Sequence, residues 1–143
     1  MGSKKAKKML DDFKAKLICL SHAVGAVRSS KEQLDKIMES LQDKSLAQEK
    51  WNQKAKEFQK CRDEMKKKWG EWPKYETKLR AEAKSVKDYC DMNAKKHKMR
   101  PLLIRDLKKI KGKVDDFLSI IDESVTVLKG FEASYKAFMQ IPL

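Results

Sequence analysis

The sequence predicts an all-α fold, an elongated antiparallel bundle of three to four long helices with coiled-coil-like 3-4 packing. Apolar residues recur at alternating steps of three and four through most of the 143 residues, which is the period of packed helices. The chain has only five Gly and three Pro, and no stretch alternates with the period of two that a strand requires. We therefore expect residues 1–143 to form a single helical-bundle domain, with residues 1–8 as a flexible basic arm.

The first helix ends either near residue 29 or at residues 43–45, because serine capping signatures occur at both places. If one helix continued through residues 43–45, its apolar stripe would contain the polar residues Lys44 and Gln48, and would therefore pack poorly. We favour a break or kink there. The two alternatives give helices over 4–28 and 30–69, or over 4–43 and 46–69.

The next break is predicted at Gly70 and Pro73. Gly70 follows the apolar residue Trp69, and Pro73 lies three residues beyond it, which is the order expected where a helix stops. We predict a tight connection from Gly70 to Pro73, with Trp72 in the loop. A single kinked helix over residues 46–98 is the alternative.

The last helix is predicted to begin at Pro101. Proline suits the first turn of a helix, and it disfavours helical geometry at the preceding Arg100. Residues 99–101 therefore form a second connection, and the helix after it spans about 38 residues with the strongest apolar stripe of the chain. Two glycines within it can bend it, Gly112 and Gly130.

The net charge of +13 comes from 34 basic and 21 acidic residues, and 29 of the basic residues are Lys. Lysine acts as a hydrated point charge, so a lysine-rich surface suits diffuse attraction to a polyanion or an acidic membrane. The charge is uneven, because residues 44–113 carry +13, whereas residues 1–43 carry +3 and residues 114–143 carry −3. This asymmetry favours an anionic partner.

Two basic segments are candidate binding surfaces, in addition to a smaller lysine cluster over residues 4–8. Residues 66–75 combine lysines with Trp69, Trp72 and Tyr75, a mixture that suits a membrane–water boundary or single-stranded nucleic acid. Residues 95–113 hold nine basic residues against one acidic residue around a helix junction. The predicted partner- or membrane-binding residues are Lys66, Lys67, Lys68, Trp72, Lys74, Lys95, Lys96, Lys98, Arg100, Arg105, Lys108, Lys109, Lys111 and Lys113.

The sequence lacks the constellations typical of enzymes. It has no glycine-rich phosphate loop, no nucleophile elbow and no helical zinc motif. Cys19 and His22, or Cys90 and His97, share a helix face without the paired spacing of a metal site. We predict no catalysis, no metal and no cofactor. We interpret the three cysteines, Cys19, Cys61 and Cys90, as reduced, half-buried thiols inside helices.

These observations predict a non-catalytic helical interaction module, an adaptor that docks through basic surfaces on an acidic protein partner or on anionic phospholipid. The alternatives are a nonspecific nucleic-acid-binding helical protein and a membrane-perturbing bundle of the toxin or cell-death executioner type. No apolar run approaches the roughly 18 residues of a spanning helix, and we expect no secretory leader. The predicted location is the cytoplasm, with peripheral attachment to membranes, and the 3.5-residue period also permits a homo-oligomer.

Overall fold

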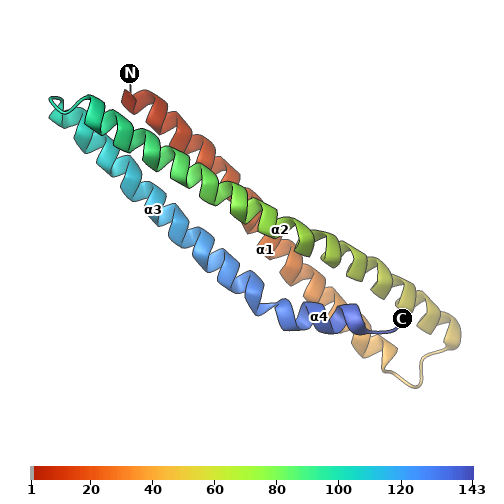
Figure 1. Ribbon diagram of the computed structural model, residues 1–143. Coiled ribbons are helices and arrows are strands. Elements are labelled where there is room, and N and C mark those ends of the chain that lie inside the picture. Colours follow the sequence, from red (N-terminus) through yellow and green to blue (C-terminus); the bar gives the residue numbers. More distant parts are fainter. Residues whose placement is uncertain (1) are drawn as a thin grey trace. The chain divides into compact units, whose positions relative to one another are not determined.

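The computed structural model describes residues 2–143, and every element of regular secondary structure within that range is helical. The three long helices pack against each other, which confirms the predicted all-α bundle. In chain order (Figure 1) the helices are α1 (Gly2–Leu41), α2 (Gln48–Lys96), α3 (Pro101–Gly130) and α4 (Glu132–Gln140).

The chain divides into two compact units. Unit 1 combines Met1–Ser21 with Lys74–Val125, and unit 2 combines His22–Pro73 with Thr126–Leu143. Each unit therefore contains a part of α1, a part of α2 and a part of α3, and α4 belongs to unit 2. The organisation of residues 1–143 as one domain stays a prediction.

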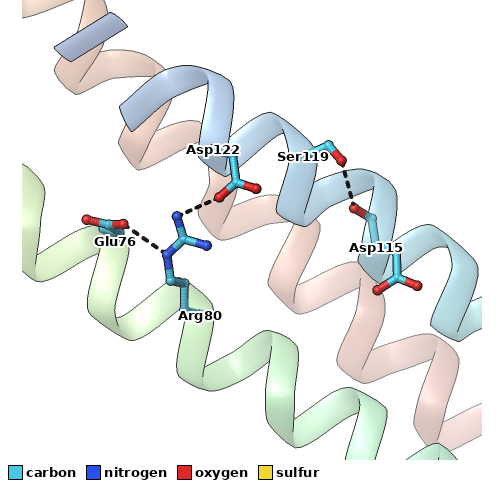
Figure 2. A network of polar contacts seen from close by, with 5 residues as sticks. All are labelled: Glu76, Arg80, Asp115, Ser119 and Asp122. Carbon is cyan, nitrogen blue, oxygen red and sulfur yellow. Dashed lines mark hydrogen bonds and ion pairs between the residues drawn. The ribbon is translucent and has the colours of Figure 1, made fainter. Parts of the chain in front are cut away.

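In unit 1, α2 and α3 are antiparallel. Lys87 pairs with Asp115 at 2.6 Å and Arg80 pairs with Asp122 at 2.7 Å, so positions along α2 fall as positions along α3 rise. Arg80 also donates a hydrogen bond to Glu76 one turn earlier in α2 (Figure 2). The buried core of unit 1 comprises Ala6, Leu10, Phe13, Leu20, Leu79, Ala83, Val86, Cys90, Leu103, Leu107, Ile110, Val114, Ile121 and Val125.

In unit 2, α1 and α2 run antiparallel on either side of a short connection over residues 42–47. The indole of Trp51 donates a hydrogen bond to the carbonyl of Leu41 at 3.1 Å, close to that connection. The short helix α4 packs on α2 through Phe138, whose ring centroid lies 6.2 Å from that of Phe58. The buried core of unit 2 comprises Ala23, Val27, Leu34, Ile37, Phe58, Met65, Trp72, Leu128 and Phe138.

The end of the first helix confirms the favoured break at residues 43–45, because α1 continues past residue 29 and ends at Leu41. The start of α1 differs from the expected flexible arm. The chain is helical from Gly2, and Ala6 is fully buried because it belongs to the same apolar stripe as Leu10. The prediction of a flexible arm is therefore wrong for residues 2–8, and Met1 lies outside the described residues.

The predicted connection from Gly70 to Pro73 is wrong, because α2 continues through both residues. A proline inside a helix removes one backbone hydrogen bond and costs about 3 kcal/mol. The buried stripe of α2 nevertheless continues across it at intervals of seven residues, through Met65, Trp72 and Leu79. Burial of each large apolar side chain contributes about 1.5–3 kcal/mol, so packing outweighs the local cost of Pro73.

The break between α2 and α3 agrees with the sequence. The connection between α2 and α3 covers residues 97–100, and α3 begins at Pro101 as predicted. The single last helix of about 38 residues is wrong, because α3 ends at Gly130, one of the two glycines expected to bend it, and α4 begins at Glu132. Gly112 lies within α3 and does not interrupt it.

Candidate functional site

The most basic surface of unit 1 is assembled from three helices. We call it the basic end, defined as residues 2–11 of α1 together with residues 89–113 of α2, the turn and α3. These residues include thirteen lysines and arginines against three aspartates. The start of α1 lies beside the connection of α2 and α3 (Figure 1), and Lys5 places its Nζ 5.2 Å from the centroid of the Tyr89 ring.

Most cations of the basic end have no acidic partner. Among the residues that the structure describes, Lys111 is the one cation of the thirteen with a carboxylate oxygen within 4.0 Å, which belongs to Asp91. The hydrogen bond with Asp91 raises the pKa of Lys111. Elsewhere in unit 1, three cations, Lys16, Arg80 and Lys87, each pair with a carboxylate on another helix. Their partners are Glu82, Asp122 and Asp115 respectively. The unneutralised charge of the unit is therefore concentrated at its basic end.

A groove of about 350 Å³ lies between α1 and α3 at the basic end. Lys7 borders it from α1, and Lys109 and Lys113 border it from successive turns of α3. Asp11 and Asp106 border the same groove, so its charge is mixed. This arrangement places the lysine cluster at the start of the chain on the same surface as the predicted cluster over residues 95–113.

The basic end also exposes large apolar side chains. Met99 is 92% exposed in the turn, Leu102 is 67% exposed in the first turn of α3, and Met92 is 60% exposed near the end of α2. These three residues fall within an eleven-residue stretch of sequence that also contains Lys95, Lys96, Lys98 and Arg100. The surface around the turn is therefore both cationic and apolar.

The backbone of the turn is held at both of its ends. The amide of His97 donates to the carbonyl of Asn93, and the amide of Arg100 donates to the carbonyl of His97, each at 3.0 Å. The amide of Ile104 then donates to the carbonyl of Arg100 at 3.1 Å, which is the first backbone hydrogen bond of α3. Met99 consequently projects from a short, hydrogen-bonded connection.

The predicted binding residues between Lys95 and Lys113 belong to the end of α2, the turn and the first part of α3 in unit 1. All of them except the half-buried Lys111 are exposed. The cluster Lys66, Lys67 and Lys68 is also exposed, but it belongs to the part of α2 in unit 2. The Nζ atom of Lys68 lies 3.7 Å from the Oε2 atom of Glu71. Lys74 is an exposed residue of α2 that belongs to unit 1.

The interpretation of Trp72 as a loop residue available for binding is wrong. Trp72 is inside α2 and only 6% exposed, and no described residue provides a hydrogen-bond partner for its Nε1 atom. Its ring lies 5.7 Å from the ring of Trp69, which in turn lies 4.7 Å from the ring of Tyr135. The aromatic residues of this segment therefore pack inside unit 2, because the helix that was expected to stop at Gly70 continues.

Sequence reasoning missed two components of the basic end. It did not single out Met92, Met99 and Leu102, and it did not connect the lysines over residues 4–8 with the later cluster. The order of the helices could have revealed the second component, because in three helices joined by short connections the start of the first lies beside the turn between the second and third. The exposure of Met99 required the structure.

The pairs Cys19–His22 and Cys90–His97 are not joined by further metal-binding side chains in the described residues. Within residues 2–143, no group of three or more His, Cys, Asp or Glu side chains is arranged to hold a metal ion. Cys61 is half-buried as expected, but Cys19 is exposed and Cys90 is fully buried, because they lie at different angles from the apolar stripes of their helices. No described helix has the length and apolar character needed to cross a membrane.

Comparison with known proteins found no matching protein-family model, no matching curated protein and no matching solved structure.

Proposed function

We propose that the protein is a non-catalytic helical interaction module that docks through the basic end of unit 1 on an anionic surface. The observation that carries this proposal is that, within residues 2–143, twelve of the thirteen cations there have no carboxylate oxygen within 4.0 Å. A cation that is already paired with a carboxylate contributes little to a ligand, whereas an unpaired cation is free to attract one.

The composition of the basic end favours attraction by charge density over recognition of one sequence. Eleven of its cations are Lys and two are Arg, so bidentate recognition by guanidinium groups has a minor part. Near an anionic membrane surface each lysine contributes about 1 kcal/mol, and this attraction falls off within a Debye length of about 8 Å at physiological salt. Binding should therefore weaken steeply as salt is added.

The test compares two variants with the same loss of four positive charges. The first replaces Lys96, Lys98, Lys108 and Lys109 by Gln at the basic end. The matched control replaces four exposed lysines of unit 2 that have no carboxylate within 4.0 Å in the described residues. Its positions are Lys44, Lys50, Lys56 and Lys60.

Each protein is titrated at 150 mM salt with vesicles containing phosphatidylserine, with neutral phosphatidylcholine vesicles, with polyglutamate and with a single-stranded oligonucleotide. We expect the basic-end variant to lose at least about tenfold in affinity for the anionic probe that wild type binds best, and the control to lose much less. Equal losses in the two variants, or no binding of wild type to any anionic probe, would overturn the proposal. The ranking of the probes identifies the class of partner, including the nucleic-acid alternative.

A further inference from the structure

The strongest feature left unexplained by charge alone is the exposed apolar group at the basic end. Met99 and Leu102 are more exposed than any other large apolar residue in the described chain. Arg100 lies between them in the sequence, and Lys98 precedes Met99 directly. An apolar group rimmed by polar or charged residues marks an interaction site more often than a scattered surface residue does.

We propose that this turn inserts Met99 and Leu102 into the interface of an anionic phospholipid bilayer, while the surrounding lysines and arginines contact lipid phosphates. This inference rests on the proposed function and names its partner. The connection of α2 and α3 then lies in the interface of the bilayer without crossing the bilayer, in agreement with the lack of a spanning helix among the described residues.

The shape of the turn favours lipid over an acidic protein. Met99 is 92% exposed, so its side chain projects from the surface and few groups of the protein cover it. A protein partner would have to supply a cavity matched to this projection, whereas the fluid boundary of headgroups and acyl chains adapts to it. Insertion by 5–10 Å is enough for residues of this kind to leave water, and this depth corresponds to one or two helical turns.

The composition of the basic end disfavours nucleic acid. Single-stranded nucleic acid is held by aromatic side chains on which the bases stack, in addition to cations. Within residues 2–11 and 89–113, the only Phe, Trp or Tyr is Tyr89, and Lys5 already lies over its ring. The exposed apolar residues are aliphatic and thioether side chains, which a bilayer accommodates and a base does not stack on.

The first experiment removes the apolar groups and leaves every charge in place. The variant is Met99→Gln with Leu102→Gln. The matched control is Ile18→Gln with Ile120→Gln, which changes two exposed apolar residues of unit 1 outside the basic end, at 55% and 47% exposure. Circular dichroism establishes that both variants fold as wild type does, since all four positions are exposed.

We expect the first variant to lose about tenfold or more in affinity for phosphatidylserine vesicles, because transfer of each apolar side chain from water is lost. The control should remain within about twofold of wild type, since its positions do not enter the lipid. Binding to polyglutamate, where it occurs, should be the same for all three proteins, because polyglutamate offers charge without an apolar phase.

A second experiment reports the environment of the turn directly. An environment-sensitive nitrobenzoxadiazole fluorophore is attached at Met99→Cys in a Cys19→Ser, Cys61→Ser background, in which the fully buried Cys90 is protected from the reagent. Phosphatidylserine vesicles should shift its emission to shorter wavelength, and lipids with quenchers on the acyl chain should quench it. The same fluorophore at Ile120→Cys should show neither change.

The possible results separate this inference from the proposed function. If the Gln variant at Met99 and Leu102 binds vesicles as wild type does and the fluorophore at position 99 stays in water, insertion is wrong, while a charge-dependent loss still supports docking by the basic end. If the Gln variant loses vesicle and polyglutamate binding equally, the apolar residues do not act through lipid and insertion is also wrong. If the four-lysine variant binds all anionic probes as wild type does, the proposed function itself fails.

Discussion

The guanidinium of Arg80 donates a hydrogen bond from Nη2 to a carboxylate oxygen of Asp122 at 2.7 Å and thereby links α2 to α3 within unit 1 (Figure 2). Its Nε donates to Glu76 at 2.9 Å, so one cation joins two carboxylates. The hydrogen bond with Asp122, and then that with Glu76, raises the pKa of Arg80. The side chains of Arg80 and Asp122 are 39% and 64% exposed, so solvent screens the pair.

We predict that Arg80→Gln lowers the free energy of unfolding by about 0.5–1 kcal/mol, the upper part of the range for exposed ion pairs, because the charged hydrogen bonds of the guanidinium to Glu76 and Asp122 are removed. Urea unfolding measures this difference, which should shrink at 1 M salt. Lys84→Gln, one turn further along α2, is the control, because Lys84 is exposed and has no carboxylate within 4.0 Å in the described residues. A loss as large for Lys84→Gln would show that the network contributes nothing specific.

Arg62 fixes the end of the described chain. Its guanidinium donates to the carbonyls of Phe138, Ile141 and Leu143 at 3.3, 2.5 and 3.4 Å. Arg62→Met keeps the apolar stem and removes the donors. We expect the free energy of unfolding to fall by about 1–3 kcal/mol, because charged donors contribute more than neutral ones.

Hydrogen exchange provides a local readout of the same contact. In Arg62→Met the amides of Ile141 and Leu143 should exchange faster than in wild type, since their segment loses its donor. Arg62→Lys should be intermediate, because an ammonium cannot reproduce the planar fork of donors. Exchange at wild-type rates in Arg62→Met would mean that the segment is held by packing alone.

Pro73 should strain α2, because it cannot donate a backbone hydrogen bond to the carbonyl of Trp69. We predict that Pro73→Ala raises the free energy of unfolding by about 1–3 kcal/mol. Gly70→Ala is the reference variant on the same helix. Apart from the adjacent backbone of its own helix, a Cβ at position 70 meets no atom of the described residues within 4 Å. This change should therefore add about 0.5–1 kcal/mol through backbone entropy. If Pro73→Ala adds no more than Gly70→Ala in urea unfolding, the proline does not strain the helix.

The connection of α1 and α2 contains a carboxylate with a shifted pKa. Asp43 accepts hydrogen bonds from the hydroxyl and from the amide of Ser45, at 2.7 and 2.9 Å, and these bonds lower its pKa. A pKa that is lower in the folded state stabilises the fold above the unfolded-state pKa, and this contribution is lost as the pH falls through the folded-state pKa.

Ser45→Ala should therefore raise the pKa of Asp43 towards its ordinary value, because it removes the hydroxyl, whose hydrogen bond is the largest cause of the shift. Carboxyl carbon-13 resonances followed through an acid titration measure it. Ser40→Ala is the serine control, since the Ser40 hydroxyl bonds the carbonyl of Lys36 and not Asp43. An unchanged pKa of Asp43 in Ser45→Ala would contradict this assignment.

The three thiols should react in the order of their exposure. Burial raises the pKa of the Cys61 and Cys90 thiols, which lowers the fraction of reactive thiolate at neutral pH. Cys19 is exposed, whereas Cys90 is fully buried. With a chromogenic disulfide reagent at pH 8, Cys19 should react first, Cys61 more slowly and Cys90 only as the protein unfolds. Single Cys→Ser variants assign each phase, and a fast phase that persists in Cys19→Ser would contradict the order.

The helical class of the protein and its apolar stripes follow from the amino-acid sequence alone. The 3-4 spacing of apolar residues is a local property, so it predicts the all-α class and most buried positions, including Leu107, Ile110 and Val114. It also predicts the helix start at Pro101, because proline acts on its own backbone. The basic residues between Lys95 and Lys113 could be found for the same reason, since their charge and their distance from the stripe are written in the sequence.

Packing of the helices against one another determines which local signals prevail and which distant residues share a surface. At Pro73 the burial of Trp72 and its neighbours outweighs a stop signal, and this changes Trp72 from an expected loop residue into a core residue. The lysines over residues 4–8 join the basic end because helices α1, α2 and α3 pack in unit 1. The exposure of Met99 is also determined by packing, because the residue type alone does not indicate whether a neighbouring helix covers an apolar side chain.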